Sequence, residues 1–452
     1  MQKTYYIATM GCQMNEYDSD YMGRLLQEAC YMPVGVPERA DLVVINTCAV
    51  REKAEQKAFS LLGRMFSLKQ RRPGMILGIM GCVAQKNGKA LLERYPDLDL
   101  VLGTRELARF KEILKELQKG KIKVAATELS RGTAPAALKE GFFKGRVKGF
   151  ITIMEGCNNF CTYCVVPYVR GREVSRPPHE IIREAEYLVK EGIKEITLLG
   201  QNVNSYLHHE KDVTGFADLL RVLQGTEGLR RIRFTTSHPK DLSPELIRSF
   251  SELDKLCSHV HLPFQAGSNR VLDAMNRGYT RETYMELVGK LRRIREDIAV
   301  TGDVMVGFPG ETREDFHLTL DLIKRVEFDG LYSFKYSDRE GTRAAGFANK
   351  IPEDEKLGRL SELQELQKSI TLKKNREMIG KETVILVEGK SRKGKQLTGR
   401  TSNNKIVNFM HDEDLIGHFV KVLIIDSHAN SLLGEIVRRP ENREERKLTA
   451  DR

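Results

Sequence analysis

The chain has 452 residues, and its 73 Lys and Arg against 62 Asp and Glu give a formal net charge of +11. Its 8 cysteines are far too few for a disulfide scaffold, in which they reach ~8–10% of residues, and no apolar run approaches the roughly 18 residues that cross a membrane. These features exclude a disulfide-stabilised secreted domain and an integral membrane protein, and they predict a cytoplasmic protein of several domains with reduced thiols and a phosphate-rich partner.

Short apolar runs in the N-terminal part alternate with segments that can form helices. The runs cover residues 5–8, 42–45 and 76–80. The helix expected after the second run places Ala54, Ala58 and Leu61 on one apolar stripe. This β-α-β-α-β order predicts an open, flavodoxin-like parallel sheet that forms an N-terminal domain over residues 1–118.

A cysteine follows each of these three runs: Cys12, Cys48 and Cys82, here called the N-terminal trio. The carboxyl ends of neighbouring parallel strands meet at one edge of a sheet, so we expect the three thiols to form one site. Gly11 and Gly81 give the backbone freedom to wrap a ligand there. The alternative is that the three are ordinary buried cysteines. Cys30, inside a predicted helix, and Cys257 lack this placement, and we expect both to serve packing.

Residues 119–143 lose the apolar periodicity and predict a linker. Strand-like and helical stretches then alternate again over residues 144–375. The strand-like stretches are 149–154, 195–199, 231–235, 258–262, 299–306 and 330–334. Six repeats are too few for a closed eight-fold barrel, so this region predicts a partial (β/α)6 TIM-like barrel whose active face lies at the carboxyl ends of its strands.

Directly after the first of these strands stands a C-x3-C-x2-C run of Cys157, Cys161 and Cys164, here called the central trio. Three thiolates at this spacing bind three corners of a cubic iron–sulfur cluster and leave one iron open for a ligand. A zinc site is the alternative, but it usually needs C-x2-C pairs and four ligands. The missing fourth cysteine therefore favours chemistry at the metal.

Polar residues follow the later barrel strands on the same predicted face. A small charged cofactor bound there would meet Gln201, Asn202, Ser237, Gln265 and Asp303. Each of these residues alone is ordinary loop chemistry, but together they outline a pocket.

Residues 353–378 predict a long amphipathic connecting helix. Five short strands follow, separated by turn residues, at 383–387, 396–400, 405–409, 418–425 and 432–437. They predict a small antiparallel β-barrel of the OB or TRAM type over 376–440, followed by a charged tail at 441–452. Its basic hairpin, which carries Lys390, Arg392, Lys393, Lys395 and Arg400, favours RNA binding over a merely solvated surface.

The sequence MEGCNNFCTYCVVPYVRGREVSRP at 154–177 resembles the signature of the radical S-adenosylmethionine methylthiotransferases. Further similar stretches are GCQMNEYDS from Gly11, INTCAVREKAEQK from Ile45, HLPFQAGS from His261, GFPGET from Gly307 and GRTSNNKIVNF from Gly399. The resemblance spans essentially the whole chain and is greatest to the tRNA-modifying branch that acts on isopentenyladenosine. Ala266 and the Thr301-Gly302 pair depart from the common pattern and affect only fine cofactor contacts.

The resemblance implies that each trio holds a [4Fe–4S] cluster. The cluster on the central trio would bind S-adenosylmethionine and generate a radical, with Tyr163 bordering the cofactor adenine. The cluster on the N-terminal trio would present the sulfur. The implied reaction inserts sulfur at carbon 2 of N6-isopentenyladenosine next to the anticodon of tRNA and transfers a methyl group to that sulfur.

The resemblance also implies the partners. The tRNA anticodon stem-loop would be anchored by Arg170 and Arg172 together with Lys393, Lys395 and Arg400. An electron donor such as flavodoxin would supply the reducing electron, and we expect a monomer that does not bind membranes.

Other readings remain open from the sequence. Sister branches of the family methylthiolate an aspartate of a ribosomal protein or threonylcarbamoyladenosine in tRNA. From a different class, the chain could be a redox-sensing iron–sulfur protein that binds RNA without catalysis.

Overall fold

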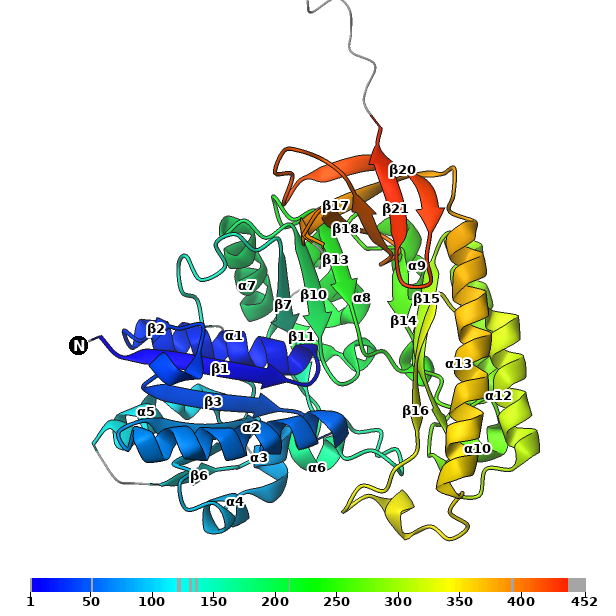
Figure 1. Cartoon of the computed structure of the whole chain (residues 1–452). Coiled ribbons are helices and arrows are strands. Elements are labelled where there is room, and N and C mark those ends of the chain that lie inside the picture. The colour runs from blue at the N-terminus through cyan, green and yellow to red at the C-terminus, as the bar shows by residue number, and fades with distance from the viewer. Residues whose placement is uncertain are drawn as a thin grey trace, which may run out of the picture.

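The structure, a computed structural model, describes residues 2–49, 52–119, 123–129, 132–134, 137–210, 212–391 and 394–437. It has three parts: an N-terminal parallel sheet with its helices, a central open barrel, and a small closed β-barrel near the C-terminal end (Figure 1). This mixed α/β architecture confirms the predicted fold class. Lys393 and the charged tail at 441–452 lie outside the described residues.

The N-terminal sheet contains six parallel strands in the order β2-β1-β3-β4-β5-β6. They are β1 (Thr4–Met10), β2 (Met32–Pro33), β3 (Leu42–Thr47), β4 (Ile76–Gly81), β5 (Leu100–Leu102) and β6 (Val124–Ala126). A first strand placed between the second and third is the flavodoxin-like order, in which ligands bind beside the carboxyl ends of the strands. Because β6 joins this sheet, the N-terminal unit extends past residue 118 into the segment predicted as a linker.

Helices cover both faces of this sheet because the strands are apolar on both sides. Leu42 and Val44 of β3 share a core with α1 (Gln13–Glu28) and α5 (Phe110–Gln118). Val43 and Ile45 face the opposite way, toward α2 (Glu52–Arg71), α3 (Cys82–Asn87) and α4 (Ala90–Arg94). The two faces follow the two-residue period of a strand.

The central barrel consists of two three-stranded parallel sheets, ordered β13-β10-β7 and β14-β15-β16. Its strands are β7 (Lys148–Thr152), β10 (Glu195–Leu199), β13 (Arg231–Phe234), β14 (His259–His261), β15 (Ala299–Val306) and β16 (Gly330–Lys335). A bridge between Ile232 and Leu256 connects the two halves, and β7 and β16 form the outer edges. The six predicted barrel strands are therefore present, in an open barrel.

Helices and short hairpins complete the barrel. The helices are α7 (Pro178–Lys190), α8 (Phe216–Gln224), α9 (Pro244–Glu252), α10 (Asn269–Ala274), α11 (Arg281–Ile294), α12 (Arg313–Val326) and α13 (Glu353–Arg376). The hairpins are β8 (Met154–Glu155) with β9 (Val174–Ser175), and β11 (Leu207–Glu210) with β12 (Val213–Gly215). Figure 1 shows the long connector α13 running beside β16.

The C-terminal module is a closed barrel with the strand order β17-β18-β19-β21-β20. Its strands are β17 (Glu382–Lys390), β18 (Leu397–Thr401), β19 (Ile406–Phe409), β20 (Phe419–Ser427) and β21 (Leu432–Ile436). The neighbours β19 and β21 pair in parallel, whereas the other pairs are antiparallel as expected. The parallel pair of β19 and β21 closes the barrel. The barrel encloses a core that includes Ile385, Val407 and Val422.

This module is seated on the amino-terminal ends of the central strands. Arg231 and Arg233, at the start of β13, donate hydrogen bonds to main-chain carbonyls of Arg400, Val384, Ser402 and Thr401. Both guanidinium groups also lie beside Glu195, at 3.7 and 2.8 Å. The buried acid offsets the burial of the two cations, so the contact orders the module against the barrel.

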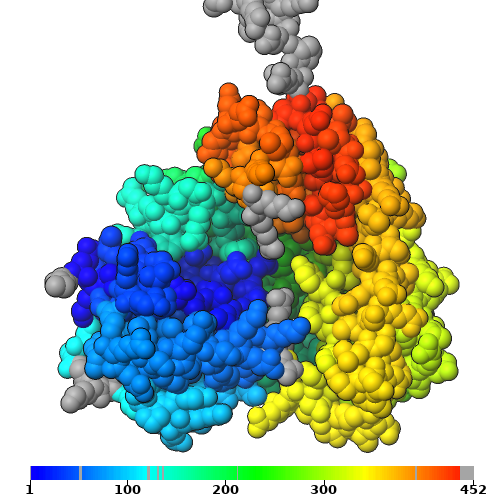
Figure 2. Space-filling view, in the orientation of Figure 1, coloured from blue at the N-terminus to red at the C-terminus, as the bar shows by residue number. Residues whose placement is uncertain are grey.

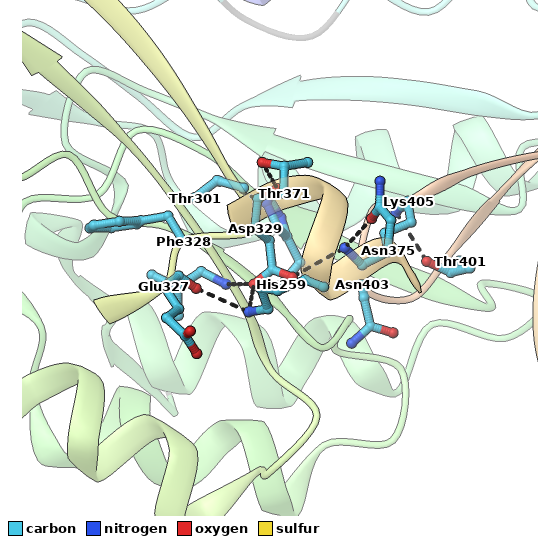
Figure 3. A network of polar contacts seen from close by, with 12 residues as sticks. His259, Thr301, Glu327, Phe328, Asp329, Thr371, Asn375, Thr401, Asn403 and Lys405 are labelled. Atoms are coloured by element: carbon cyan, nitrogen blue, oxygen red, sulfur yellow. Dashed lines mark hydrogen bonds and ion pairs between the residues drawn. The ribbon is translucent and has the colours of Figure 1, made fainter. Parts of the chain in front are cut away.

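A second contact lies at the start of β14, β15 and β16 (Figure 3). Asp329 pairs with Lys374 at 2.7 Å and with Lys405 of the small barrel at 3.2 Å. Lys405 also donates to the Asn375 side chain, and the Thr301 hydroxyl lies 2.9 Å from Nε2 of His259. The small barrel therefore covers the end of the central barrel opposite the predicted active face.

Two further observations bear on the sequence predictions. In the part of the chain that the structure describes, no helix is both long and apolar enough to span a bilayer. Cys257 is buried, as expected, but Cys30 is exposed in a turn after α1 and takes a φ of 63°. The packing role predicted for Cys30 is wrong because α1 ends two residues earlier than that prediction required.

Candidate active site

The N-terminal trio lies at the carboxyl edge of the N-terminal sheet. Cys12 caps α1 after β1, Cys48 follows β3, and Cys82 opens α3 after β4. Cys48 and Cys82 are buried, and Cys12 is half-buried. The flavodoxin-like strand order places this edge where such folds bind ligands. The three cysteines therefore lie at the same edge of the sheet.

Hydrogen bonds connect the thiols to one another. Cys48 interacts with both Cys12 and Cys82, and these bonds, with burial, raise the pKa of Cys48. The same bonds lower the pKa of Cys12 and of Cys82, and the positive charge of Arg170 lowers both pKa values further. Two of the three thiols, Cys12 and Cys82, therefore favour the thiolate form that binds a cationic metal centre.

Two glycines allow the edge to close around the trio. A Cβ on Gly11 would lie 2.7 Å from the Cβ of Cys48, and φ at Gly11 is +154°. A Cβ on Gly81 would lie 2.7 Å from the carbonyl of Thr47, at a φ of +89°. Side chains at either position would push the cysteine loops apart.

The central trio lies in the loop between β8 and α6 (Val166–Arg170). Cys157 and Cys161 are buried and Cys164 is half-buried. The loop begins at Gly156, with φ at +83°, where a Cβ would lie 2.0 Å from the carbonyl of Arg172. The Cys157 amide donates to the carbonyl of Gly171 at 3.1 Å, which folds the loop back on itself.

Residues from distant segments hold this loop in place. The Thr162 hydroxyl donates to the carbonyl of Ala274, and the Asn276 amide donates to the carbonyls of Asn159 and Phe160. Arg277 is buried and donates to the Sγ of Cys161 at 3.4 Å. Sequence reasoning missed Arg277, because no spacing pattern relates it to the cysteines.

The short helix α6 connects the two trios. It begins two residues after Cys164, and its Val169 packs in the same core as Cys82. The Thr104 hydroxyl and the Arg105 guanidinium donate to the carbonyls of Val169 and Arg170 at 2.8 and 3.0 Å. The central trio is therefore anchored directly to the N-terminal sheet that carries the other trio.

Arg170, at the end of α6, does not fit the predicted contact with RNA phosphates. Its side chain is 3% exposed and pairs with Asp18 at 2.7 Å. Its positive charge lowers the pKa of Cys82. Because its side chain is buried, Arg170 cannot contact RNA phosphates, and the sequence prediction is wrong. Arg170 is instead a buried cation beside the N-terminal trio.

The predicted cofactor residues surround the mouth of the central barrel. The Gln201 side chain accepts a hydrogen bond from the Gly156 amide, and Asn202 donates to Asp241 at 2.7 Å. The Gln265 amide donates to the carbonyl of Asp303 at 2.9 Å, and the Asp303 carboxylate lies 3.4 Å from His261 Nε2.

Some buried polar atoms at this mouth have no partner among the described residues: Asn202 Oδ1, Ser237 Oγ and His238 Nε2. Burial, with the positive charge of Arg277, lowers the pKa of His238 to about 2, so this imidazole is neutral. Unpartnered buried polar atoms are uncommon and fit a bound polar ligand. Tyr163, packed beside Ala266 and Phe308, borders the same region, and its burial raises its pKa.

The other residues predicted to contact RNA phosphates differ in how exposed their side chains are. Arg172 is exposed and lies over the Phe160 ring at 5.2 Å, and Lys395 is exposed. Arg400 is half-buried and pairs with Glu388 at 3.2 Å. Lys393 falls outside the residues that are described.

The donor atoms of both trios suit iron–sulfur clusters, which thiolates bind. Within the described residues, no three His, Cys, Asp or Glu side chains are grouped closely enough for a single metal ion. In a cubane each thiolate binds a different iron, so wider spacing is expected.

Three family matches follow the three parts of the fold. Residues 151–323 match the Radical SAM superfamily, and residues 376–437 match the TRAM domain. Residues 4–103 match the Uncharacterized protein family UPF0004. Membership of the radical SAM superfamily implies S-adenosylmethionine and a [4Fe–4S] cluster as cofactors.

Among solved structures, the fold is similar to the radical S-adenosylmethionine methyltransferase TsrM from Kitasatospora setae. The TM-score is 0.56 at 14% identity, covering 76% of this chain and 77% of that one. The cobalamin-dependent S-adenosylmethionine radical enzyme OxsB has a TM-score of 0.52 at 13% identity, covering 81% of this chain and 56% of that chain. At these identities the likeness concerns the fold.

Curated relatives match over nearly their whole length. A tRNA-2-methylthio-N(6)-dimethylallyladenosine synthase from Syntrophus aciditrophicus (strain SB) is 50% identical, covering 96% of this chain and 95% of the relative. A synthase of the same name from Geobacter sulfurreducens is 49% identical, covering 96% and 98%. The chain therefore belongs to the tRNA-2-methylthio-N(6)-dimethylallyladenosine synthase family.

Proposed function

We propose that the chain is a tRNA methylthiotransferase that adds a methylthio group to carbon 2 of N6-isopentenyladenosine next to the anticodon. The names of its relatives support this reaction. One structural observation carries the proposal: two separate trios of cysteines are connected by α6, which packs its Val169 against the core that holds Cys82. Such an arrangement suits a reaction that needs one centre for a radical and another for sulfur.

In this proposal Cys157, Cys161 and Cys164 of the central trio would hold one [4Fe–4S] cluster. When bound, the cluster and S-adenosylmethionine supply the radical chemistry needed to break an inert C–H bond. The surrounding residues would orient the cofactor. Asn202, Ser237, Gln265 and Asp303 offer polar groups for its charged end, and Tyr163 offers a ring beside its adenine.

The N-terminal trio holds the second [4Fe–4S] cluster. Arg170 favours the thiolate forms of Cys12 and Cys82, and the chain therefore presents anionic ligands to the metal. Asp18 balances the charge of Arg170 when no metal is present. The pair keeps this guanidinium fixed beside the thiols.

The inner face of β16 supports an apolar base as the substrate. Tyr332 is 59% exposed and Phe334 is 36% exposed, although both point toward the barrel interior beside Asp303 and Met305. Their neighbours Ser333 and Lys335 contact α13 on the outer face. Exposed aromatic rings inside a barrel suit a base that carries an isopentenyl group better than an aspartate or a threonylcarbamoyl acid.

The remaining partners follow from this activity. A tRNA anticodon stem-loop can present an unstacked base, which duplex RNA cannot. Arg172, Lys395 and the TRAM module would hold its phosphates. An electron donor such as flavodoxin would reduce the central cluster, and the chain would act as a monomer.

Anaerobically reconstituted protein tests the proposal directly. With dithionite, S-adenosylmethionine and isopentenyladenosine-containing stem-loop RNA, we expect 5′-deoxyadenosine and a 2-methylthio nucleoside. Absence of 5′-deoxyadenosine would favour a redox-sensing RNA-binding protein. Nucleoside analysis of a deletion strain then identifies the substrate: unchanged 2-methylthio-isopentenyladenosine would move the activity to the ribosomal aspartate or to threonylcarbamoyladenosine.

A further inference from the structure

A hollow of about 540 Å³ opens beside α2 of the N-terminal sheet. Its lining consists of Met10, Lys53, Gln56, Lys57, Ser60 and Arg64. Met10 is the last residue of β1, two positions before Cys12. The hollow therefore lies at the edge of the sheet that carries the N-terminal trio.

One side of this hollow is a continuous polar face of α2, formed by Lys53, Lys57, Ser60 and Arg64 and here called the α2 stripe. All four side chains are exposed. Their spacing of four, three and four residues keeps them on one face of a helix. The opposite face, with Ala58 and Leu62, is buried against the sheet. The stripe is therefore a solvent-facing surface and not part of the core.

The positive charges of the stripe are not neutralised within the described part of the chain, where Lys53, Lys57 and Arg64 make no ion pair. Elsewhere on the same domain, exposed lysines do find acidic partners, as Lys111 does with Glu28. From the helical rise of ~1.5 Å per residue, the three cations extend over roughly 16 Å. That length exceeds a single phosphate and suits several phosphates of one strand.

The helix that carries the stripe also borders the central barrel, and Gln56 lines both this hollow and the one described next. A second hollow of about 440 Å³ is lined by Glu55, Gln56 and Phe59 of α2 and by the loop after β16 at Ser337, Asp338 and Arg339. In Figure 2 the light-blue surface of α2 faces the yellow surface of that loop, and the orange and red C-terminal module stands above the gap. A strand of RNA that reaches the barrel from the TRAM module would pass along α2.

We propose that the α2 stripe binds the phosphate backbone of the RNA that delivers its base to the barrel. This proposal rests on the proposed function, since it requires an RNA substrate. Three unpaired cations along an open hollow attract a polyanion by releasing its condensed counterions. A small anion is a poor occupant because the hollow is open and its cations are spread along the helix. The stripe adds a contact that lies across the gap from the TRAM module.

The test uses the full-length protein carrying Lys53→Gln, Lys57→Gln and Arg64→Gln together. Binding of isopentenyladenosine-containing anticodon stem-loop RNA is measured from low to high salt. Each lost phosphate contact removes about 0.7 from the slope of log affinity against log salt. We therefore expect the slope to fall in magnitude by about 2 and the affinity at 0.1 M salt to fall by about 100-fold.

A matched control removes the same number of charges from the other face of the sheet. Lys111, Lys115 and Lys119 lie on and directly after α5, and all three are exposed. Changing them to Gln should leave the affinity and the salt slope within about twofold of the original protein. Cleavage of S-adenosylmethionine without RNA should be unchanged in both variants, which verifies that the active site is intact.

The outcomes separate this proposal from the proposed function. If the original protein methylthiolates RNA and the stripe variant binds it with unchanged affinity and slope, the α2 stripe is not the phosphate contact, although the function stands. An equal loss of RNA affinity in the control variant would show that the effect comes from the net charge of the protein, and it would also overturn the proposal. If the original protein neither binds nor modifies the RNA, both the function and the stripe assignment fail.

Discussion

Arg170 links the central loop to the N-terminal domain. It stands at the end of α6, which follows the central trio; its guanidinium pairs with Asp18 of the N-terminal domain, and its charge lowers the pKa of Cys82. Buried charges are tolerated only when they are paired, because desolvation costs several kcal/mol per ion. The domain contact therefore depends on both members of the Arg170–Asp18 pair.

Replacing Arg170 by Gln should lower the free energy of unfolding by about 3–5 kcal/mol, since Asp18 would remain buried without a counter-charge. Urea unfolding measures the change. The double variant Arg170→Gln with Asp18→Asn should lose less than the sum of the two single variants, because their effects share one interaction. A loss below about 1 kcal/mol in the single variant would show that the pair does not hold the domains together.

The two trios should fail in different ways when one cysteine is removed. Cys161→Ala should abolish cleavage of S-adenosylmethionine, because the cluster that binds it loses a ligand. Cys48→Ala should leave this cleavage intact and abolish formation of the methylthio nucleoside. Both products are measured in one anaerobic assay by liquid chromatography. A normal yield of methylthiolated RNA from Cys48→Ala would disprove the assignment of the N-terminal trio.

The sequence predicts the cysteines of the two trios better than the residues that hold the cysteine loops in place. The cysteines stand at recognisable positions, three after apolar runs and three in a compact spacing pattern. Arg277 and Arg170 acquire their roles from contacts between segments that are far apart in the chain. A basic residue near a signature is usually exposed, so the burial of Arg170 could not be inferred from its position.

Among the elements, β16 carries an unusual distribution of side chains. It forms an outer edge of the open barrel, and its inner face exposes Tyr332 and Phe334. The ring of Tyr332 lies 5.9 Å from that of His261, so this residue is oriented by its neighbour. A flat, exposed ring held in this way can stack on a base.

Tyr332→Ala and Phe334→Ala should each weaken binding of the isopentenyladenosine stem-loop, because stacking of one base contributes about 1–3 kcal/mol. The expected rise in KM or Kd is therefore about tenfold, and it should be smaller for RNA with unmodified adenosine. Leu318→Ala, at an apolar side chain that is 41% exposed on α12, is the matched control and should have no effect. Equal losses for both RNAs would mean that the rings do not read the isopentenyl group.

His259, at the start of β14, makes the stability of the fold depend on pH. His259 is buried there, and burial together with the charges of Arg233, His261, Arg400 and Lys405 holds its pKa well below the usual 6.5. The folded protein keeps this imidazole neutral, whereas the unfolded chain takes up a proton below about pH 6.5. The unfolded state then binds more protons, so stability falls as the pH decreases.

The expected loss from His259 is up to about 1.4 kcal/mol per pH unit below pH 6.5. His259→Gln keeps a polar partner for Thr301. It should reduce the slope of unfolding free energy against pH by the amount that corresponds to the uptake of about one proton. Unfolding in urea at several pH values between 5 and 7.5 measures it. An unchanged slope in His259→Gln would show that His259 does not titrate on unfolding.

Across the whole molecule, local patterns predict the parts, and tertiary contacts determine how they assemble. Apolar runs identify β1, β3 and β4 of the N-terminal sheet and the strands of both barrels, because buried parallel strands and alternating barrel strands leave clear patterns. The short strands β2 and β5 were not predicted. The strand β6 is short and weakly apolar, which is why the sequence predicts a linker at this position. The seat of the TRAM module depends on Arg231, Arg233 and Asp329, which pair with residues more than a hundred positions away or with the following helix.

The assembly of the three units explains why they occur in one chain. The N-terminal edge and the central loop share α6, while the small barrel is fixed to the opposite end of the central strands. This arrangement connects both trios through one short helix and places the basic module at the other end of the central strands. The account as a whole requires that each trio holds its own cluster.

Mössbauer spectroscopy combined with iron and sulfide analysis of anaerobically purified protein tests this requirement most directly. The account predicts two [4Fe–4S] clusters per chain in the original protein, and one remaining cluster after Cys12, Cys48 and Cys82 are changed to Ala. A single cluster in the original protein, or an unchanged spectrum in the triple variant, would contradict it.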